Sequence, residues 1–112
     1  MKGFFNKDNI KILKGRLDLL NNIEKAREAI INKEYDKAKL YAKEALVMNS
    51  SSAEVENLLG VIEELTGSKK IAQCYYRAAL DFDPTYLPAE NNLKRLTLYN
   101  SGLFDIDIGE DH

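Results

Sequence analysis

The chain holds a single histidine and a single cysteine, and the placement of its candidate catalytic residues argues against a catalytic site. Glu63 and Glu64 could share acid–base work as paired carboxylates, but adjacent residues on a helix point in different directions. The one histidine, His112, stands at the very C-terminus. Cys74, three residues before Arg77, could act as a thiolate nucleophile. A solvated acidic helix face and a partly buried, inert thiol explain these residues better, so we predict that the protein is not an enzyme.

Composition places the 112-residue chain among ordinary single-domain globular proteins. Hydrophobic residues make up 45% and charged residues 30%, which argues against disorder and against a disulfide scaffold. The net charge of −2 does not indicate the excess of basic residues that is typical of nucleic-acid-binding proteins. One cysteine cannot form an internal disulfide or a cysteine-based zinc site, and we expect no metal and no cofactor. With no apolar run of membrane-spanning length and no signal-peptide pattern, the sequence predicts a cytoplasmic protein that binds no membrane.

Hydrophobic residues recur at helical spacing through most of the chain. The first pattern predicts helix over residues 8–33, and Gly15 leaves open whether this is one helix or two. After residue 34, helix start and stop signals divide the chain into four shorter helices. These signals are Asp36, the capping box of Ser51 and Glu54, the stop at Gly67 with a cap at Ser68, the stop at Asp83-Pro84 with a cap at Thr85, and the stop at residues 100–102.

The helical region contains an internal repeat with a period of 34 residues. When the sequence is shifted by 34 residues and aligned with itself, small, aromatic, polar and aliphatic residues match residues of the same kind. So many matches at one period are poorly explained by chance. The paired residues are Ala38 and Ala72, Tyr41 and Tyr75, Ala45 and Ala79, Leu46 and Leu80, Asn57 and Asn91, and Leu59 and Leu93.

The copy over residues 53–86 resembles the tetratricopeptide repeat (TPR) family, whose 34-residue pattern contains Leu-Gly, then Ala-x₃-aromatic, then proline. The matching residues here are Leu59, Gly60, Ala72, Tyr76, Ala79 and Pro84. Glu56 and Glu63 depart from the pattern, because they occupy the aromatic positions of its first helix. The preceding copy, residues 19–52, keeps only part of the pattern.

The resemblance implies an all-α fold, a right-handed stack of antiparallel helix hairpins of the TPR-like α-solenoid type. About two repeats with capping helices at both ends would form it. The expected organisation is an N-terminal segment with a capping helix over residues 1–18, a TPR-like domain over 19–99 with repeats at 19–52 and 53–86 and a C-terminal capping helix at 87–99, and an acidic tail over 100–112.

In this family the first helix of each hairpin lines a concave groove, so the resemblance also implies a binding site. The groove positions correspond to Ile23, Arg27, Glu54, Asn57, Val61, Glu64, Asn91, Arg95 and Tyr99. We therefore predict a non-catalytic protein–protein interaction adaptor that holds a protein or peptide segment. A ligand with an apolar anchor and a basic side chain would suit this groove, and Arg27 and Arg95 could hold a carboxylate. Alternatively, these charges only keep an exposed face soluble.

Two other functions stay open. The protein could be a structural module that self-associates into a homodimer through its repeat ends or its tails, because two repeats alone are marginally stable. An enzymatic activity that uses Cys74 or the glutamates is the weakest of the three hypotheses.

The two ends of the chain carry opposite charges. Residues 1–16 hold five basic residues and one acidic residue, whereas residues 103–112 hold four acidic residues and neither lysine nor arginine. In this tail Ile106 and Ile108 alternate with aspartates, as in a short strand. The tail could add to a partner's sheet edge, dock on the chain's own groove, or form a disordered, solubilising end.

Overall fold

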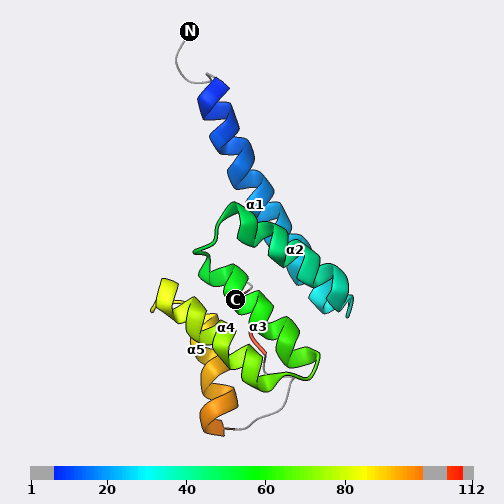
Figure 1. The fold of residues 1–112 in the computed structure, drawn as a ribbon, viewed down its shortest axis with the longest axis vertical. Helices are drawn as coiled ribbons and strands as arrows, with labels where there is room; N and C mark the ends of the chain where they lie inside the picture. The colour runs from blue at the N-terminus through cyan, green and yellow to red at the C-terminus, as the bar shows by residue number, and fades with distance from the viewer. Residues whose placement is uncertain (1–6, 100–105, 110–112) are drawn as a thin grey trace.

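Residues 7–99 and 106–109, apart from the side chain of Tyr99, are described by the computed structural model, and every regular element among them is a helix. The elements are α1 (Lys7–Ile31), α2 (Tyr35–Met48), α3 (Ala53–Leu65), α4 (Lys69–Phe82), α5 (Leu87–Lys94) and a π-helical turn, η1 (Arg95–Tyr99) (Figure 1). The all-α prediction is confirmed. The last predicted helix, 87–99, is present as α5 and η1 together, and residues 106–109 form no strand.

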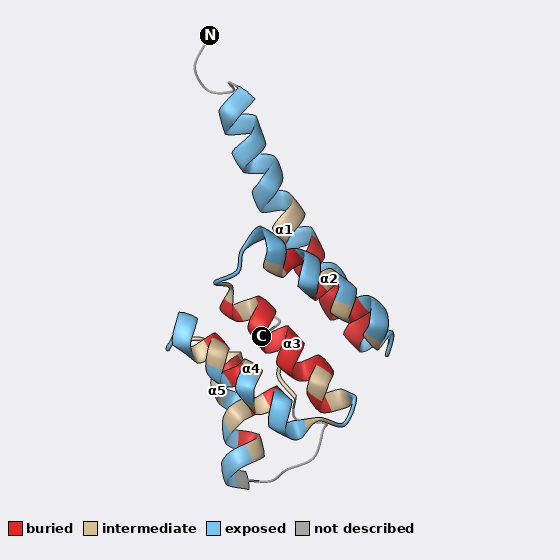
Figure 2. Ribbon diagram, viewed as in Figure 1, coloured by how far each residue is buried: buried red, intermediate tan, exposed pale blue. Residues whose placement is uncertain are grey.

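Consecutive helices pack side by side as hairpins. α1 lies against α2 and α3 lies against α4, and three residues join the two helices of each pair. α3 also contacts α1, α2 and α5, so it is the central helix of the fold (Figure 1). Most of its residues are buried for this reason (Figure 2).

Backbone hydrogen bonds at the helix ends repeat at the same interval of 34 residues. Lys33 after α1 and Gly67 after α3 both have left-handed backbones, with φ of 60° and 106°, as in the Schellman motif that ends a helix. The sequence repeat is therefore also a repeat of structure. The matched N–H to carbonyl pairs are Glu34 to Ala29 and Ser68 to Glu63 (both 2.8 Å), Lys33 to Ile30 (3.0 Å) and Gly67 to Glu64 (3.3 Å), and Asn49 to Ala45 (3.0 Å) and Asp83 to Ala79 (2.9 Å).

α1 is one unbroken helix of 25 residues, which answers the question that Gly15 left open. Gly15 is exposed, and a Cβ at this position would meet nothing within 4 Å. Residues 7–17 are exposed throughout and project beyond the other helices (Figure 2). The described part of the predicted N-terminal segment, 7–18, thus runs directly into the first hairpin. Among the described residues, no helix has both the length and the apolar character needed to cross a bilayer.

Small residues allow the paired helices to approach closely. Gly60 of α3 faces the ring of Tyr76 in α4, and a Cβ at position 60 would lie 2.5 Å from Tyr76 Cε1. This close contact explains a glycine in the middle of a helix. Fully buried alanines serve the same purpose in α2 and α4, namely Ala38, Ala42, Ala45, Ala72 and Ala79.

Three helix starts differ from the predicted caps by one or two residues, whereas α4 begins directly after Ser68 as predicted, although the Ser68 side chain makes no capping hydrogen bond. Ser52, not Ser51, caps α3, and its hydroxyl accepts a 3.3 Å bond from an N–H of the first turn. Asp36 lies inside the first turn of α2. Thr85 does not cap α5, because its N–H and its hydroxyl both donate to the carboxylate of Asp83, at 3.0 and 2.6 Å.

Candidate functional site

Residues 106–109 of the tail lie against one face of the helices. Arg27 of α1, Asn57 of α3, and Asn91 and Asn92 of α5 each donate a hydrogen bond to this segment. We call these four residues the tail-binding face. Of the three arrangements left open for the tail, the described segment adopts the one in which it docks on the chain's own helices.

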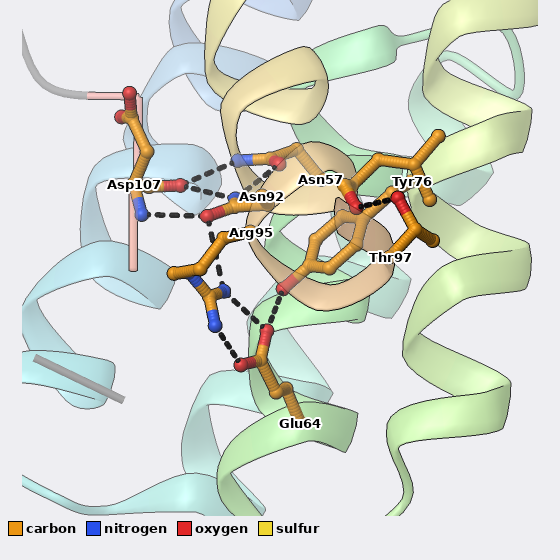
Figure 3. A network of polar contacts seen from close by, with 8 residues as sticks. Asn57, Glu64, Tyr76, Asn92, Arg95, Thr97 and Asp107 are labelled. Atoms are coloured by element: carbon orange, nitrogen blue, oxygen red, sulfur yellow. Dashed lines mark hydrogen bonds and ion pairs between the residues drawn. The ribbon is translucent and has the colours of Figure 1, made fainter. Parts of the chain in front are cut away.

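The main chain of Asp107 is held by two buried carboxamides. Asn92 Oδ1 accepts from the Asp107 N–H, and Asn92 Nδ2 donates to the Asp107 carbonyl, both at 2.8 Å. Asn57 Nδ2 donates to the same carbonyl at 3.0 Å, and its Oδ1 accepts from Asn92 Nδ2 at 2.9 Å (Figure 3). Both asparagines are fully buried. Together they satisfy the donor and the acceptor of one backbone residue, as a neighbouring strand would.

The side chains of the segment alternate between two environments. Ile106 and Ile108 pack against the main hydrophobic core. The carboxylate of Asp107 instead accepts from Asn91 Nδ2 at 3.2 Å and from the Gly109 N–H at 2.9 Å. Alternation of this kind is typical of an extended chain.

Arg27 fixes the next residue of the segment. Its Nε donates to the Ile108 carbonyl at 2.9 Å, while its Nη atoms bind Glu24 at 2.6 Å and Glu54 at 2.9 Å. Burial opposes the charge, but the hydrogen bonds to Glu54 and Glu24 outweigh it and raise the pKa of Arg27 above its ordinary value. The two carboxylates therefore hold a charged guanidinium in position to bind a backbone carbonyl.

Gly109 occupies a position that suits only glycine. Its φ is 81°, in the left-handed region. A Cβ there would lie 2.5 Å from the Tyr86 hydroxyl and 3.1 Å from Arg27 Nη2. Burial and the negative charge of Glu54 raise the pKa of Tyr86 to about 12, so this hydroxyl is neutral at physiological pH.

A buried ion pair next to Asn92 ties η1 to α3. Arg95 Nη1 and Nη2 bind the two carboxylate oxygens of Glu64 at 2.6 and 2.7 Å, and the Tyr76 hydroxyl donates to Glu64 at 2.8 Å (Figure 3). Burial, followed by the charge of Glu64, raises the pKa of Tyr76 far above its usual range. Arg95 Nη2 also donates to Asn92 Oδ1 at 3.4 Å. The pair thereby helps to orient the carboxamide that holds Asp107.

Three of the predicted groove residues, Arg27, Asn57 and Asn91, contact the tail segment directly. Glu54 contributes indirectly, because its carboxylate binds the Arg27 guanidinium. Two others are buried members of the core cluster against which the isoleucines of the tail pack, namely Ile23 and Val61.

Glu64 and Arg95 are buried and do not lie where a ligand could reach them. Glu64 and Arg95 bind each other, so Arg95 does not offer its guanidinium to the carboxylate of a ligand as expected. The side chain of Tyr99 lies outside the described residues. The segment that lies on this face presents an acidic side chain, Asp107, to Asn91.

The side chains considered for catalysis do not converge. Glu63 binds Lys39 at 3.2 Å, away from Glu64 and its partner Arg95. Cys74 is exposed rather than partly buried. Within the described ranges, no group of three or more His, Cys, Asp or Glu side chains is arranged to hold a metal ion.

Sequence reasoning missed Asn92 as a site residue. The 34-residue shift pairs Asn57 with Asn91. The residue that hydrogen-bonds Asn57 in the structure is the next one, Asn92. The available signal was the doubling of asparagine at positions 91 and 92.

The tail-binding face gathers donors from three helices that are distant in the sequence. Its three carboxamides and one guanidinium can hold a peptide backbone and a carboxylate, and none of the four is a nucleophile. Comparison of the chain with protein-family models, with curated proteins and with solved structures found no match.

Proposed function

We propose that this protein is a non-catalytic protein–protein interaction adaptor whose tail-binding face holds an extended segment of a partner protein. One observation carries the proposal: Asn57 and Asn92 bind both backbone groups of a single residue. Contacts of this kind give affinity for an extended chain whatever its side chain, while pockets for the neighbouring side chains give specificity.

We propose a TPR-like architecture, a right-handed stack of helix hairpins, as the frame of this face. Three observations support it: the 34-residue repeat in the sequence, the same interval between helix-end hydrogen bonds, and the packing of Gly60 on Tyr76. In such a stack every second helix contributes to one face. The donors to the tail segment come from α1, α3 and α5, in agreement with this arrangement.

A selection of random peptides on the full chain tests the proposed function. The enriched peptides are then measured by fluorescence anisotropy on the wild-type protein and on Asn92→Ala. Because this substitution removes the donor and the acceptor that hold one backbone residue, we expect affinity to fall about tenfold or more.

Asn21→Ala is the matched control, since Asn21 is exposed on α1 outside the tail-binding face. It should bind the same peptides with wild-type affinity. Both variants are first compared with the wild type by circular dichroism. Enriched peptides that bind Asn92→Ala as tightly as the wild type would place peptide binding elsewhere on the surface and refute the proposal.

Self-association is the second candidate function, and a separate observation favours it. Ile10, Leu13, Leu17 and Leu20 follow one another at spacings of three, four and three residues along α1, and each is roughly half exposed. This spacing is the one by which helices pair in coiled coils. The stripe therefore offers a surface for a second copy of the chain.

A further inference from the structure

We infer that residues 106–109 are an internal ligand, and that the partner segments which the tail-binding face accepts share their pattern of apolar residue, Asp, apolar residue and Gly. The inference rests on the proposed function and names the ligand class and its regulation. A partner then binds only when its segment displaces the tail.

Each position of the pattern has its own contact. The core receives Ile106 and Ile108, and the amide of Asn91 reaches the Asp107 carboxylate. Gly109 is required by its left-handed backbone and by the Tyr86 hydroxyl, which leaves no room for a Cβ. The backbone contacts supply affinity for any extended chain, so these four side-chain positions supply the selectivity.

Occupancy by the tail and by a partner is mutually exclusive. Asn92 uses its donor and its acceptor on Asp107, and Asn57 uses its donor on the same carbonyl. Both asparagines have no exposed surface while the segment is docked. A second backbone therefore cannot reach either carboxamide until residues 106–109 leave.

The tail competes strongly because it belongs to the same chain. Only residues 100–105 separate η1 from the docked segment, and a short connection gives a tethered ligand an effective concentration in the millimolar range. The apparent affinity for an external segment falls in proportion to the fraction of chains whose site is empty. A tail that is docked nine-tenths of the time weakens external binding about tenfold.

A peptide with the sequence of residues 103–112, LFDIDIGEDH, labelled with fluorescein at its N-terminus, tests this inference by fluorescence anisotropy. The full-length double variant Ile106→Ser/Ile108→Ser should bind the peptide about tenfold or more tightly than the wild type, because its own tail no longer competes. Ile31→Ser/Ile71→Ser is the matched control with two exposed isoleucines, and it should bind the peptide as the wild type does.

A second full-length variant, Gly109→Ala, guards against loss of the fold in the double variant. It weakens tail docking through one methyl group, so it should also bind the peptide more tightly than the wild type. The same substitution within the peptide should weaken binding to every variant. A peptide with proline at the Asp107 position should not bind, because proline lacks the N–H that Asn92 accepts.

The outcomes separate this inference from the proposed function. Equal affinity of the wild type and both tail variants would overturn the internal ligand, while peptide binding itself would stand. Binding that Asn92→Ala leaves unchanged would overturn the proposed function. If the affinity of the wild type for the peptide rises when the protein is diluted, the tail of one chain occupies the site of another. That result would overturn the inference that each tail occupies the site of its own chain.

Discussion

Asn57 and Asn92 stand 35 positions apart in the chain, yet their carboxamides meet at 2.9 Å and both donate to the carbonyl of Asp107. Neither amide could satisfy its hydrogen-bonding groups in the core without the other and without the tail. The docked tail is therefore part of the fold as well as an occupant of the site.

Asn92→Ala should release the tail and destabilise the helices together. The substitution leaves the buried Asn57 Oδ1 without its donor and removes the acceptor of the Asp107 N–H, so we expect the free energy of unfolding to fall by about 1–3 kcal/mol. Hydrogen exchange should show lost protection at the Asp107 amide. Protection equal to the wild type would contradict the described docking, and Asn21→Ala should leave both quantities unchanged.

Two glycine-to-alanine substitutions in helices should have opposite effects. Gly60→Ala places a methyl group against Tyr76 and should lower the free energy of unfolding by about 1–3 kcal/mol through overpacking. Gly15→Ala adds a methyl group in open space and should stabilise the free half of α1 by up to about 1 kcal/mol. Urea unfolding measures the first effect and amide exchange in α1 measures the second. Equal effects at the two sites would be inconsistent with the packing of α3 on α4.

The two hairpin turns allow a reciprocal test. Lys33 has a left-handed backbone, so Lys33→Gly should raise the free energy of unfolding by about 0.5–1 kcal/mol after the added freedom of the unfolded chain is subtracted. Gly67→Ala at the equivalent position should lower it by about 1 kcal/mol, although a Cβ there meets no atom within 4 Å. Both values come from urea unfolding at neutral pH. A loss of stability in Lys33→Gly would argue against the Schellman turn after α1.

Alkaline pH should destabilise the protein through its buried tyrosines. Tyr86 keeps its proton in the folded state up to a pKa of about 12, whereas an exposed tyrosine loses it near 10. Between these values the folded state binds more protons than the unfolded state, so stability falls as the pH rises from 10 to 12. Tyr76 acts in the same direction.

The variant Tyr86→Phe isolates this effect from the titration of other groups. Its free energy of unfolding, measured at several pH values between 9 and 12, should decline less steeply than that of the wild type. Parallel curves for the two proteins would show that Tyr86 does not titrate differently in the folded and unfolded states.

The stripe on α1 predicts weak self-association. Leu13→Glu/Leu17→Glu removes apolar contact area and adds like charges, so it should weaken a dimer about tenfold or more. Because both leucines are exposed, the stability of the monomer should not change. Sedimentation equilibrium over a range of concentrations gives the dissociation constants. A wild-type protein that stays monomeric at every concentration would eliminate this candidate function.

Most helices of the fold could be predicted because their apolar residues recur at a helical period and their ends carry strong signals. Gly67 marks the end of the first helix of its hairpin through its left-handed backbone. The equivalent turn at Lys33 carries no such signal, since a lysine, which does not favour a left-handed backbone, adopts the same conformation there. The continuity of α1 through Gly15 was equally hidden, because a glycine in an exposed helix lowers stability without breaking the helix.

The site was predicted in part because repeat spacing identifies a helix face but not what its side chains bond to. The face of Arg27, Asn57 and Asn91 was implied by the resemblance to the TPR family. The same resemblance also placed Glu64 and Arg95 on it, and no spacing rule shows that two side chains of opposite charge on different helices will bind each other. The occupation of the face by the tail depends on how the whole chain folds back, which local patterns do not contain.

The unbroken course of α1 places two surfaces on a single helix axis. Arg27, at the docked tail, and Leu13, on the projecting stripe, stand fourteen residues apart, and a rise of 1.5 Å per residue separates them by about 21 Å along one axis. A protein that binds the exposed half of α1, residues 7–17, would consequently lie at a fixed distance and in a fixed orientation relative to the segment on the tail-binding face.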